Sequence, residues 1–250
     1  MEFLFGNATV KKLPSAKKAP TKPTKLAERE ASDLGLAIGI DLGTTFSCVA
    51  VMIDGKVHVC PDEDGRRTMP SYVSFAQEAP FQPQLFVGHE AKQLAKTNPI
   101  HTVFDSKRLI GRQFSDATCQ ADMKLLPYSV VQADGDKPSI QVRVNGKERE
   151  YPPEEIAAMV LSKMKRVAKD YLEELGTHKS QGALNAVITV PAYFNDMQRE
   201  MTQNAGRTTK ERTTRACSLA RPHVCRLRAS VLSLLSPLRL GVAVCQSWQG

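Results

Sequence analysis

Alternation of apolar and other residues is the first pattern along the chain, and it begins after a polar N-terminal stretch. Apolar residues alternate at 36–40, and an apolar, β-branched run follows at 46–53. The pair Asp54-Gly55 supplies the residues of a tight turn, after which a third apolar stretch begins. The pattern predicts three strands within residues 34–60, joined by short turns as antiparallel neighbours.

The next segment is rich in turn residues and then changes period. A short strand is predicted at 72–75, and two prolines predict a loop over 76–85. Residues 90–96 have helical composition and stop before Asn98-Pro99. This part of the chain therefore predicts one strand, one loop and one short helix.

A second hairpin and a long helix are predicted in the middle of the chain. Residues 140–144 alternate apolar and polar side chains, and Asn145-Gly146 fits a type I′ turn. Pro153 then opens a helix that Gly176 ends, with acidic residues in its first turn. Apolar residues recur along it at spacings of three and four, which predicts one buried face. These residues are Ile156, Val160, Met164, Val167, Tyr171 and Leu175.

One more strand and one more helix follow. Residues 186–190 form a compact β-branched run that Pro191 closes. Asn195 precedes Gln198 by three residues, which predicts a capping box at the start of a helix. Gly206 is predicted to end that helix. After Gly206 the alternation of strand, turn and capped helix does not continue.

Charge separates the two ends from the body. The net charge is +8, but the basic excess lies in residues 1–32 and 207–250, and the body between them is slightly acidic. A nucleic-acid-binding body would gather Lys and Arg on one face, so a nucleic-acid partner is not predicted. Residues 1–33, rich in Lys, Pro and Ala, predict a flexible basic tail, with a transit peptide as the alternative. The apolar run at 229–245 is interrupted by a proline and an arginine, and it is shorter than the roughly 20 residues that span a bilayer.

The six cysteines are isolated, which is typical of a reducing compartment. Cys217, His223 and Cys225 lie close together in sequence, but no fourth residue has the spacing of a zinc ligand, so no metal site is predicted there. The N-terminus lacks the long apolar run of a secretory signal. We therefore expect a cytoplasmic chain with no membrane partner.

The segment GIDLGTTF at residues 39–46 carries the candidate chemistry. A phosphate chain needs several backbone N–H groups aimed at one point, and Gly43 leaves the main chain unobstructed. Thr44 and Thr45 add hydroxyl groups, and Asp41, at the end of a strand, can hold Mg²⁺ through its water shell. These residues alone leave two readings open, a phosphate loop or a plain turn between two strands. The chain has neither a Walker-type motif nor G-x-G-x-x-G, so a nucleotide would bind through another architecture.

Several runs in this chain resemble, in order and spacing, the heat shock protein 70 family of chaperones. They cover about residues 34–206. The resemblance implies an α/β, actin-like ATPase fold of the ribonuclease H-like kind, of which this chain carries essentially lobe I. The runs are Gly39–Val51, Arg67–Val73, Asn98-Pro99 with Thr102–Arg112, Glu154–Ile156 and Val187–Asp196.

The resemblance implies a role for each residue of the loop. Gly43, Thr44, Thr45 and Phe46 would contact the β- and γ-phosphates of ATP or ADP, and Asp41 would bind Mg²⁺ through water. Phe46 departs from the pattern, since the family more often has Tyr there, but the backbone amide is the group that matters most.

Three residues outside the loop also receive roles from the resemblance. Lys107 would act in catalysis by sitting near the γ-phosphate and placing the attacking water. Pro191 and Arg199 would belong to a relay between the nucleotide state and a partner domain. For Lys107 and Arg199, an ordinary solvated side chain is the alternative that composition alone would favour.

The resemblance stops at about Gly206. The family continues with a glutamate-proline segment, a second phosphate loop, an adenosine-binding segment and a peptide-binding domain, and the Arg- and Ser-rich residues 207–250 match none of these. We expect a truncated form with weak or absent ATPase. Its tail is expected to be disordered or foreign to the domain, resembling a shifted reading frame or an unspliced intron.

The sequence is compatible with three functions. The resemblance implies an ATP-binding chaperone that acts on unfolded protein clients together with cochaperones. A non-catalytic fragment that serves as a binding or decoy protein is the alternative. A kinase of the same actin-like fold is the third, and the match over Thr102–Arg112 argues against it.

Overall fold

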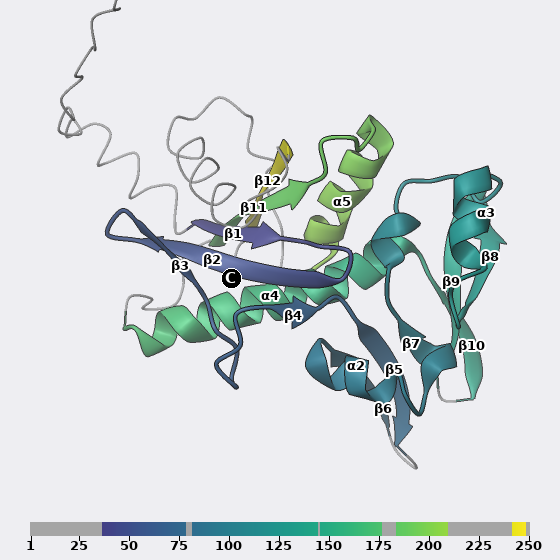
Figure 1. Ribbon diagram of the computed structural model, residues 1–250, viewed down its shortest axis with the longest axis horizontal. Helices are drawn as coiled ribbons and strands as arrows, with labels where there is room; N and C mark the ends of the chain where they lie inside the picture. Colours follow the sequence, from purple (N-terminus) through teal and green to yellow (C-terminus); the bar gives the residue numbers. More distant parts are fainter. Residues whose placement is uncertain (1–36, 79–81, 145, 177–183, 210–241, 249–250) are drawn as a thin grey trace, which may run out of the picture. The chain divides into compact units, whose positions relative to one another are not determined.

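A mixed sheet of six strands positions the candidate site in the computed structural model (Figure 1). The structure describes residues 37–78, 82–144, 146–176, 184–209 and 242–248. The strand order is β12-β11-β1-β2-β3, and β4 pairs with β2 outside that order. The strands are β1 (Ala37–Asp41), β2 (Phe46–Ile53), β3 (Lys56–Val59), β4 (Met69–Pro70), β11 (Leu184–Val190) and β12 (Val242–Trp248).

The first three strands are antiparallel neighbours, which confirms the prediction from the alternating pattern. Strand β1 also pairs with β11, and this pairing is parallel, with Asp41 opposite Thr189. Parallel neighbours need a long connection, and here it contains two smaller sheets and a long helix. Strand β1 therefore lies between β2 and β11, and its residues from Ile38 to Ile40 are buried.

Two helices complete the core around this sheet. Helix α4 (Pro153–Glu174) packs against β1 and β2, and α5 (Asp196–Thr208) packs against α4 (Figure 1). The predicted apolar face of α4 is buried from Ile156 to Val167, but Tyr171 is only partly buried and Leu175 is 45% exposed. The capping box at the start of α5 is present as predicted.

Two three-stranded sheets lie in the connection between β4 and α4. One has the order β6-β5-β7 and the other β10-β9-β8, in which the β9–β10 hairpin was predicted. Short helices flank them. The strands are β5 (Val73–Glu78), β6 (Gln82–Val87), β7 (Thr102–Val103), β8 (Ser129–Ala133), β9 (Lys137–Val144) and β10 (Lys147–Tyr151). The helices are α2 (His89–Leu94), η1 (Pro99–His101), η2 (Ser106–Arg108) and α3 (Ala117–Met123).

The loop predicted over residues 76–85 is wrong. Strands β5 and β6 pair there as a hairpin, with Gln77 opposite Pro83. Strand β6 is at the edge of its sheet and has a neighbouring strand on one side only, which is where strands tolerate proline. The predicted end of the last helix at Gly206 is also wrong, because α5 continues to Thr208 and Gly206 is buried within it.

The tail after α5 contributes one described strand. Residues Val242–Trp248 form β12, which pairs with β11 in antiparallel fashion. This strand argues against the disordered alternative for these residues, and the alternative of a tail foreign to the domain stays a prediction. The predictions for residues 1–33, for 210–241 and for the cysteines and histidine at 217–225 lie outside the described residues. Of the helices in the described ranges, none combines the length and the apolar character that crossing a bilayer requires.

Candidate functional site

The candidate site is the turn that joins β1 to β2. Strand β1 ends at Asp41 and β2 begins at Phe46, so four residues reverse the chain. A Cβ atom added to Gly43 would lie 2.0 Å from the carbonyl oxygen of Phe46. Only glycine fits this tight turn, and the same lack of a side chain leaves the main chain accessible to a phosphate group.

Ser71 supports this turn through hydrogen bonds, a role that was not predicted for it. Strand β4 pairs with the start of β2, which places Ser71 beside the turn. The Ser71 hydroxyl donates to the carbonyl oxygen of Gly43 at 2.8 Å, and the Ser71 amide donates to the carbonyl oxygen of Thr45 at 2.9 Å. The Ser47 and Ser71 hydroxyl oxygens are 2.9 Å apart. These bonds hold the turn in one conformation.

Lys107 reaches the turn from a distant part of the chain. Its side chain comes from η2, and its ammonium group donates a hydrogen bond to the carbonyl oxygen of Leu42. The Lys107 nitrogen also lies 5.4 Å from the centre of the Phe194 ring. Burial lowers the pKa of Lys107 to about 8, and the negative charge of Asp41 opposes that shift. The expectation that Lys107 belongs to the site therefore has a geometric basis.

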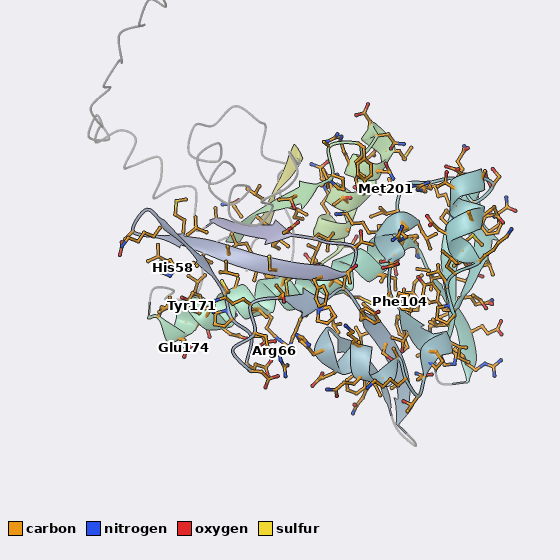
Figure 2. All side chains as sticks on the ribbon, in the orientation of Figure 1. His58, Arg66, Phe104, Tyr171, Glu174 and Met201 are labelled. Atoms are coloured by element: carbon orange, nitrogen blue, oxygen red, sulfur yellow. The ribbon has the colours of Figure 1, made fainter. Side chains whose placement is uncertain are left out.

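Aromatic packing fixes the segment that carries Lys107. The Phe104 ring stacks on Tyr72 with 5.0 Å between ring centroids, and it meets Tyr128 edge-on at 5.9 Å. Figure 2 marks the position of Phe104. The Tyr128 hydroxyl donates to the Phe104 carbonyl oxygen. Asp105 follows in the left-handed backbone region, which turns the chain into η2. The backbone just before Lys107 is therefore held in place by aromatic packing.

Asp41 lies at the inner end of the turn, between two neighbouring strands. The hydroxyl of Thr189 on β11 donates a hydrogen bond of 2.5 Å to Asp41 Oδ1. On the other side Cys48 of β2 pairs with Asp41 in the sheet register. Burial, and then the charge of Asp41, raises the pKa of the Cys48 thiol to about 12, so this cysteine is a neutral thiol at neutral pH.

The outer half of the turn faces solvent. Thr45 is exposed, Thr44 is half-buried, and the Phe46 side chain is 45% exposed. The Lys92 nitrogen lies 5.1 Å from the centre of the Phe46 ring and 5.9 Å from that of Tyr72. Lys92 therefore adds a cation at the rim of the turn, which no sequence motif had indicated.

Pro191 and Arg199 lie next to the site but not in the turn. Pro191 follows β11, and its carbonyl oxygen accepts a 3.2 Å hydrogen bond from the amide of Phe194. Arg199 on α5 donates to the carbonyl oxygen of Ala192 at 3.0 Å. Phe194 thus links Pro191 to Lys107, since its amide bonds to the Pro191 carbonyl oxygen and its ring lies 5.4 Å from the Lys107 nitrogen. The relay through Pro191 and Arg199 stays a prediction.

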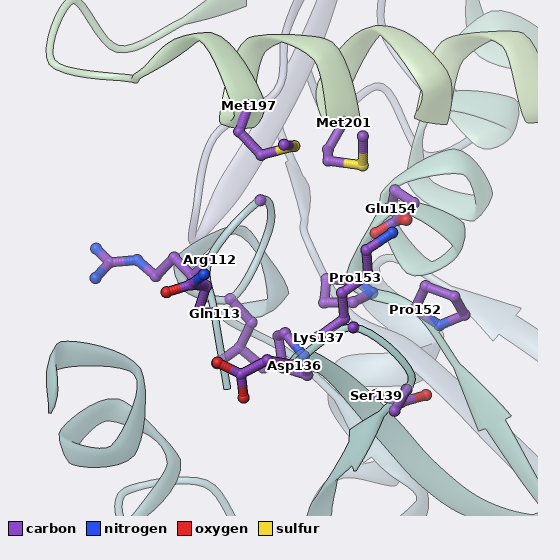
Figure 3. Close-up of a pocket in the computed structure, with 15 residues that line it drawn as sticks. Arg112, Gln113, Asp136, Lys137, Ser139, Pro152, Pro153, Glu154, Met197 and Met201 are labelled. Atoms are coloured by element: carbon purple, nitrogen blue, oxygen red, sulfur yellow. The ribbon is translucent and has the colours of Figure 1, made fainter. Parts of the chain in front are cut away.

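A separate cavity of about 270 Å³ lies between the N-terminal ends of α4 and α5 (Figure 3). Met197 and Met201 of α5 line one side of it, and Asp136, Lys137 and Ser139 lie across from them. Pro152 and Pro153, at the start of α4, also line the cavity. Neither the turn at residues 41–46 nor Lys107 lines it. The cavity is therefore not the predicted phosphate site.

The chemistry of the turn matches a phosphate and a magnesium ion. Backbone amides, two threonine hydroxyls and the partly buried cation of Lys107 suit a phosphate chain. No three His, Cys, Asp or Glu side chains gather as a metal cluster in the described part of the chain. Mg²⁺ would therefore depend on Asp41, retained waters and phosphate oxygens, which is the coordination that Mg²⁺ usually keeps in nucleotide sites.

Comparison with known proteins places most of the chain in one family. The family model described as Hsp70 protein matches residues 37–212. The chain is 49% identical over 170 residues to a heat shock 70 kDa protein from Trichophyton rubrum, covering 68% of this chain and 24% of that one. It is 49% identical over 175 residues to heat shock cognate 70 kDa protein 3 from Dictyostelium discoideum, covering 70% and 26%. It is 48% identical over 171 residues to the putative heat shock 70 kDa protein 7 from Homo sapiens, covering 68% and 43%. The chain thus spans about a quarter of the first two relatives.

Proposed function

This chain belongs to the Hsp70 family, with the α/β architecture of an actin-like nucleotide-binding lobe, and we propose that its β1–β2 turn binds the phosphates of ATP or ADP. The observation that carries the proposal is the hydrogen bond from the Lys107 ammonium group to the carbonyl oxygen of Leu42. That bond holds a partly buried cation against the turn, where it can neutralise phosphate oxygens. The second reading from sequence, a plain turn between strands, would give no reason to bury a lysine there.

Each residue of the site has a part in this proposal. The amides of residues 43–46 and the hydroxyls of Thr44 and Thr45 bind phosphate oxygens, and Gly43 gives them room. Lys107 stabilises negative charge at the terminal phosphate and orients the water that attacks it. Asp41 would hold Mg²⁺ through its water shell, and the ion would supply neutralisation of phosphate charge.

We further propose that the 250-residue chain hydrolyses ATP slowly or not at all. Phosphoryl transfer depends on several charged groups placed around one phosphate, and losing one such group commonly costs about 10²–10³-fold in rate. Among the described residues, the site brings together one carboxylate, Asp41, and one partly buried lysine, Lys107. A non-catalytic protein that binds nucleotide or protein partners is the second candidate, since such a turn can bind phosphates without hydrolysing them.

The broader chaperone function extends the proposal beyond the site. ATP-dependent folding of unfolded clients, together with cochaperones and a stress-response role, is what membership of the family suggests. Pro191 and Arg199 would pass the nucleotide state to such partners. The cytoplasmic location expected from the sequence stays a prediction.

Nucleotide titration of the full 250-residue chain tests the proposal. ATP with Mg²⁺ should shift the backbone amide signals of residues 41–46 in ¹⁵N NMR spectra, which detect even millimolar affinity. Lys107→Met should weaken that response at least tenfold. Lys169→Met on the exposed side of α4 serves as the control and should leave it unchanged. Saturating ATP that moves no signal in residues 41–46 would contradict the proposal, and turnover as fast as that of a full-length Hsp70 would contradict the slow-ATPase part.

A further inference from the structure

The threonine beside Asp41 has no assigned role in the site. We propose that Thr189 is a positioning residue, whose hydroxyl fixes the orientation of the Asp41 carboxylate and thereby tunes the affinity of the site for Mg²⁺. This inference rests on the proposed function, because it concerns the same Mg²⁺–nucleotide site. The two can fail separately, because the Mg²⁺ dependence of the Thr189 variants and the ATP response of the wild-type chain are measured independently.

The sheet register places the two side chains side by side. Strand β11 pairs with β1 in parallel over five residues, and Thr189 stands opposite Asp41 at the end of that pairing. The Thr189 hydroxyl donates to Asp41 Oδ1 at 2.5 Å, the short distance of a charge-assisted bond. The two residues are far apart in the chain, so the parallel pairing alone creates this contact.

Because Thr189 is buried, its hydroxyl depends on Asp41 as a hydrogen-bond acceptor. Thr189 is 6% exposed and lies between Ile188 and Val190, which are buried as well. A valine has the same shape and would pack equally well in such a strand, but it lacks the hydroxyl. A buried hydroxyl without an acceptor is costly, and Asp41 Oδ1 is the acceptor that the structure gives it. Packing therefore does not account for a threonine at this position.

The neighbours of Asp41 do not provide a second fixed donor within the described residues. Cys48 stands opposite Asp41 on β2, but a thiol is a weak donor. Lys107 interacts with Asp41 through charge, while its hydrogen bond goes to the carbonyl oxygen of Leu42. Thr189 is thus the group that sets the rotation of the carboxylate, and Oδ2 receives no hydrogen bond from the described residues.

An oriented carboxylate binds a metal or its water shell better than one free to rotate. Groups that orient a metal-binding side chain typically change metal affinity by about 10–100-fold. Because Asp41 would act through water, a smaller effect is expected here, roughly three- to tenfold. The change should appear in the Mg²⁺ dependence of nucleotide binding and not in the Mg²⁺-independent part.

The experiment titrates MgCl₂ into the full chain at a fixed ATP concentration and follows the amide signals of residues 41–46. Thr189→Val should raise the Mg²⁺ concentration for half-saturation roughly three- to tenfold, whereas the ATP response in EDTA should stay within about twofold. Thr189→Ser keeps the hydroxyl and should restore the wild-type value. The pair Thr189→Ser and Thr189→Ala differs by one hydroxyl and repeats the comparison if the valine variant unfolds.

A double mutant separates positioning from a merely structural role. In an Asp41→Asn background, Thr189→Val should cause no further change in Mg²⁺ dependence, because the hydroxyl acts through the carboxylate. An unchanged Mg²⁺ half-saturation in Thr189→Val, or an equal weakening in the Asp41→Asn background, overturns the inference while leaving the proposed function intact. A wild-type chain that does not respond to ATP at all overturns both.

Discussion

A Cβ atom on Gly43 would lie 2.0 Å from the carbonyl oxygen of Phe46, a separation that no packed protein tolerates. The turn between β1 and β2 is therefore closed so tightly that its own backbone occupies the place of a side chain. Ser71 holds the same turn from outside through the carbonyl oxygens of Gly43 and Thr45. A rigid turn presents its amide groups in one arrangement, which is what a phosphate site needs.

The first prediction concerns that contact. Gly43→Ala forces the turn open, and we expect a loss of about 1–3 kcal/mol in the free energy of unfolding, as for other overpacked sites. The ATP response of residues 41–46 should disappear. Gly65→Ala is the matched control, because Gly65 has a φ of +78° but no atom within 4 Å of the added Cβ. It should cost roughly 1–2 kcal/mol from backbone strain alone and leave the ATP response intact. An alanine variant at 43 that binds ATP like the wild type would contradict this prediction.

The second prediction concerns the contact between the Lys107 segment and α5. Gly111 has a φ of +64°, and a Cβ there would lie 2.6 Å from Gln198 Cα and 2.8 Å from its nitrogen. Gly111→Ala combines backbone strain with a backbone clash, so we expect a destabilisation of about 2–5 kcal/mol. Urea unfolding measures the difference. Gly176→Ala shares the left-handed backbone, at a φ of +67°, but meets open space. Equal losses in the free energy of unfolding at the two positions would show that the contact with α5 contributes nothing to stability.

The third prediction tests the start of α5. The Asn195 side chain accepts a hydrogen bond of 2.8 Å from the Gln198 amide, and the Gln198 side chain accepts one of 3.1 Å from the Asn195 amide. Asn195→Ala should therefore cost about 1 kcal/mol, whereas Asn195→Asp keeps the acceptor and should cost less. Thermal unfolding of the two variants decides between them. An alanine variant as stable as the aspartate variant would mean that the cap contributes nothing.

Local patterns in the sequence predicted the elements whose signals are local. The apolar runs and short turns over residues 34–60 predicted the antiparallel strands β1, β2 and β3. The spacing of Asn195 and Gln198 predicted the capping box. The β5–β6 hairpin was missed because proline is typical of loops, and the sequence does not show that β6 is an edge strand, where proline is tolerated. Helix α3 was missed because seven residues carry too little periodicity to identify a helix.

The residues of the site divide in the same way. Motif resemblance indicated Asp41, Gly43 and Lys107, although only folding shows that Lys107 reaches the carbonyl oxygen of Leu42. Thr189 and Ser71 gave no such signal, because their roles depend on a parallel pairing and on the β2–β4 contact between distant segments. Single-sequence reasoning finds groups that chemistry requires and misses groups that act by holding another residue in place.

The fourth prediction follows from the lowered pKa of Lys107. Burial brings this pKa to about 8, against an ordinary value of about 10.4 in the unfolded chain. Below pH 8 the lysine is charged in both states and the cost of burying the charge is constant. Between about pH 8 and 10.4 the unfolded chain keeps a proton that the folded chain has released, so stability relative to Lys107→Met should rise with pH across this window.

Phosphate beside the ammonium group favours the charged form, so ATP should move the titration midpoint of Lys107 upward. NMR spectra of ¹³C-labelled lysine measure that midpoint, and the Lys107→Met spectrum assigns the signal. A midpoint near 10.4 without ATP would contradict the lowering of the pKa by burial. A midpoint that ATP leaves unchanged would place Lys107 outside the phosphate site.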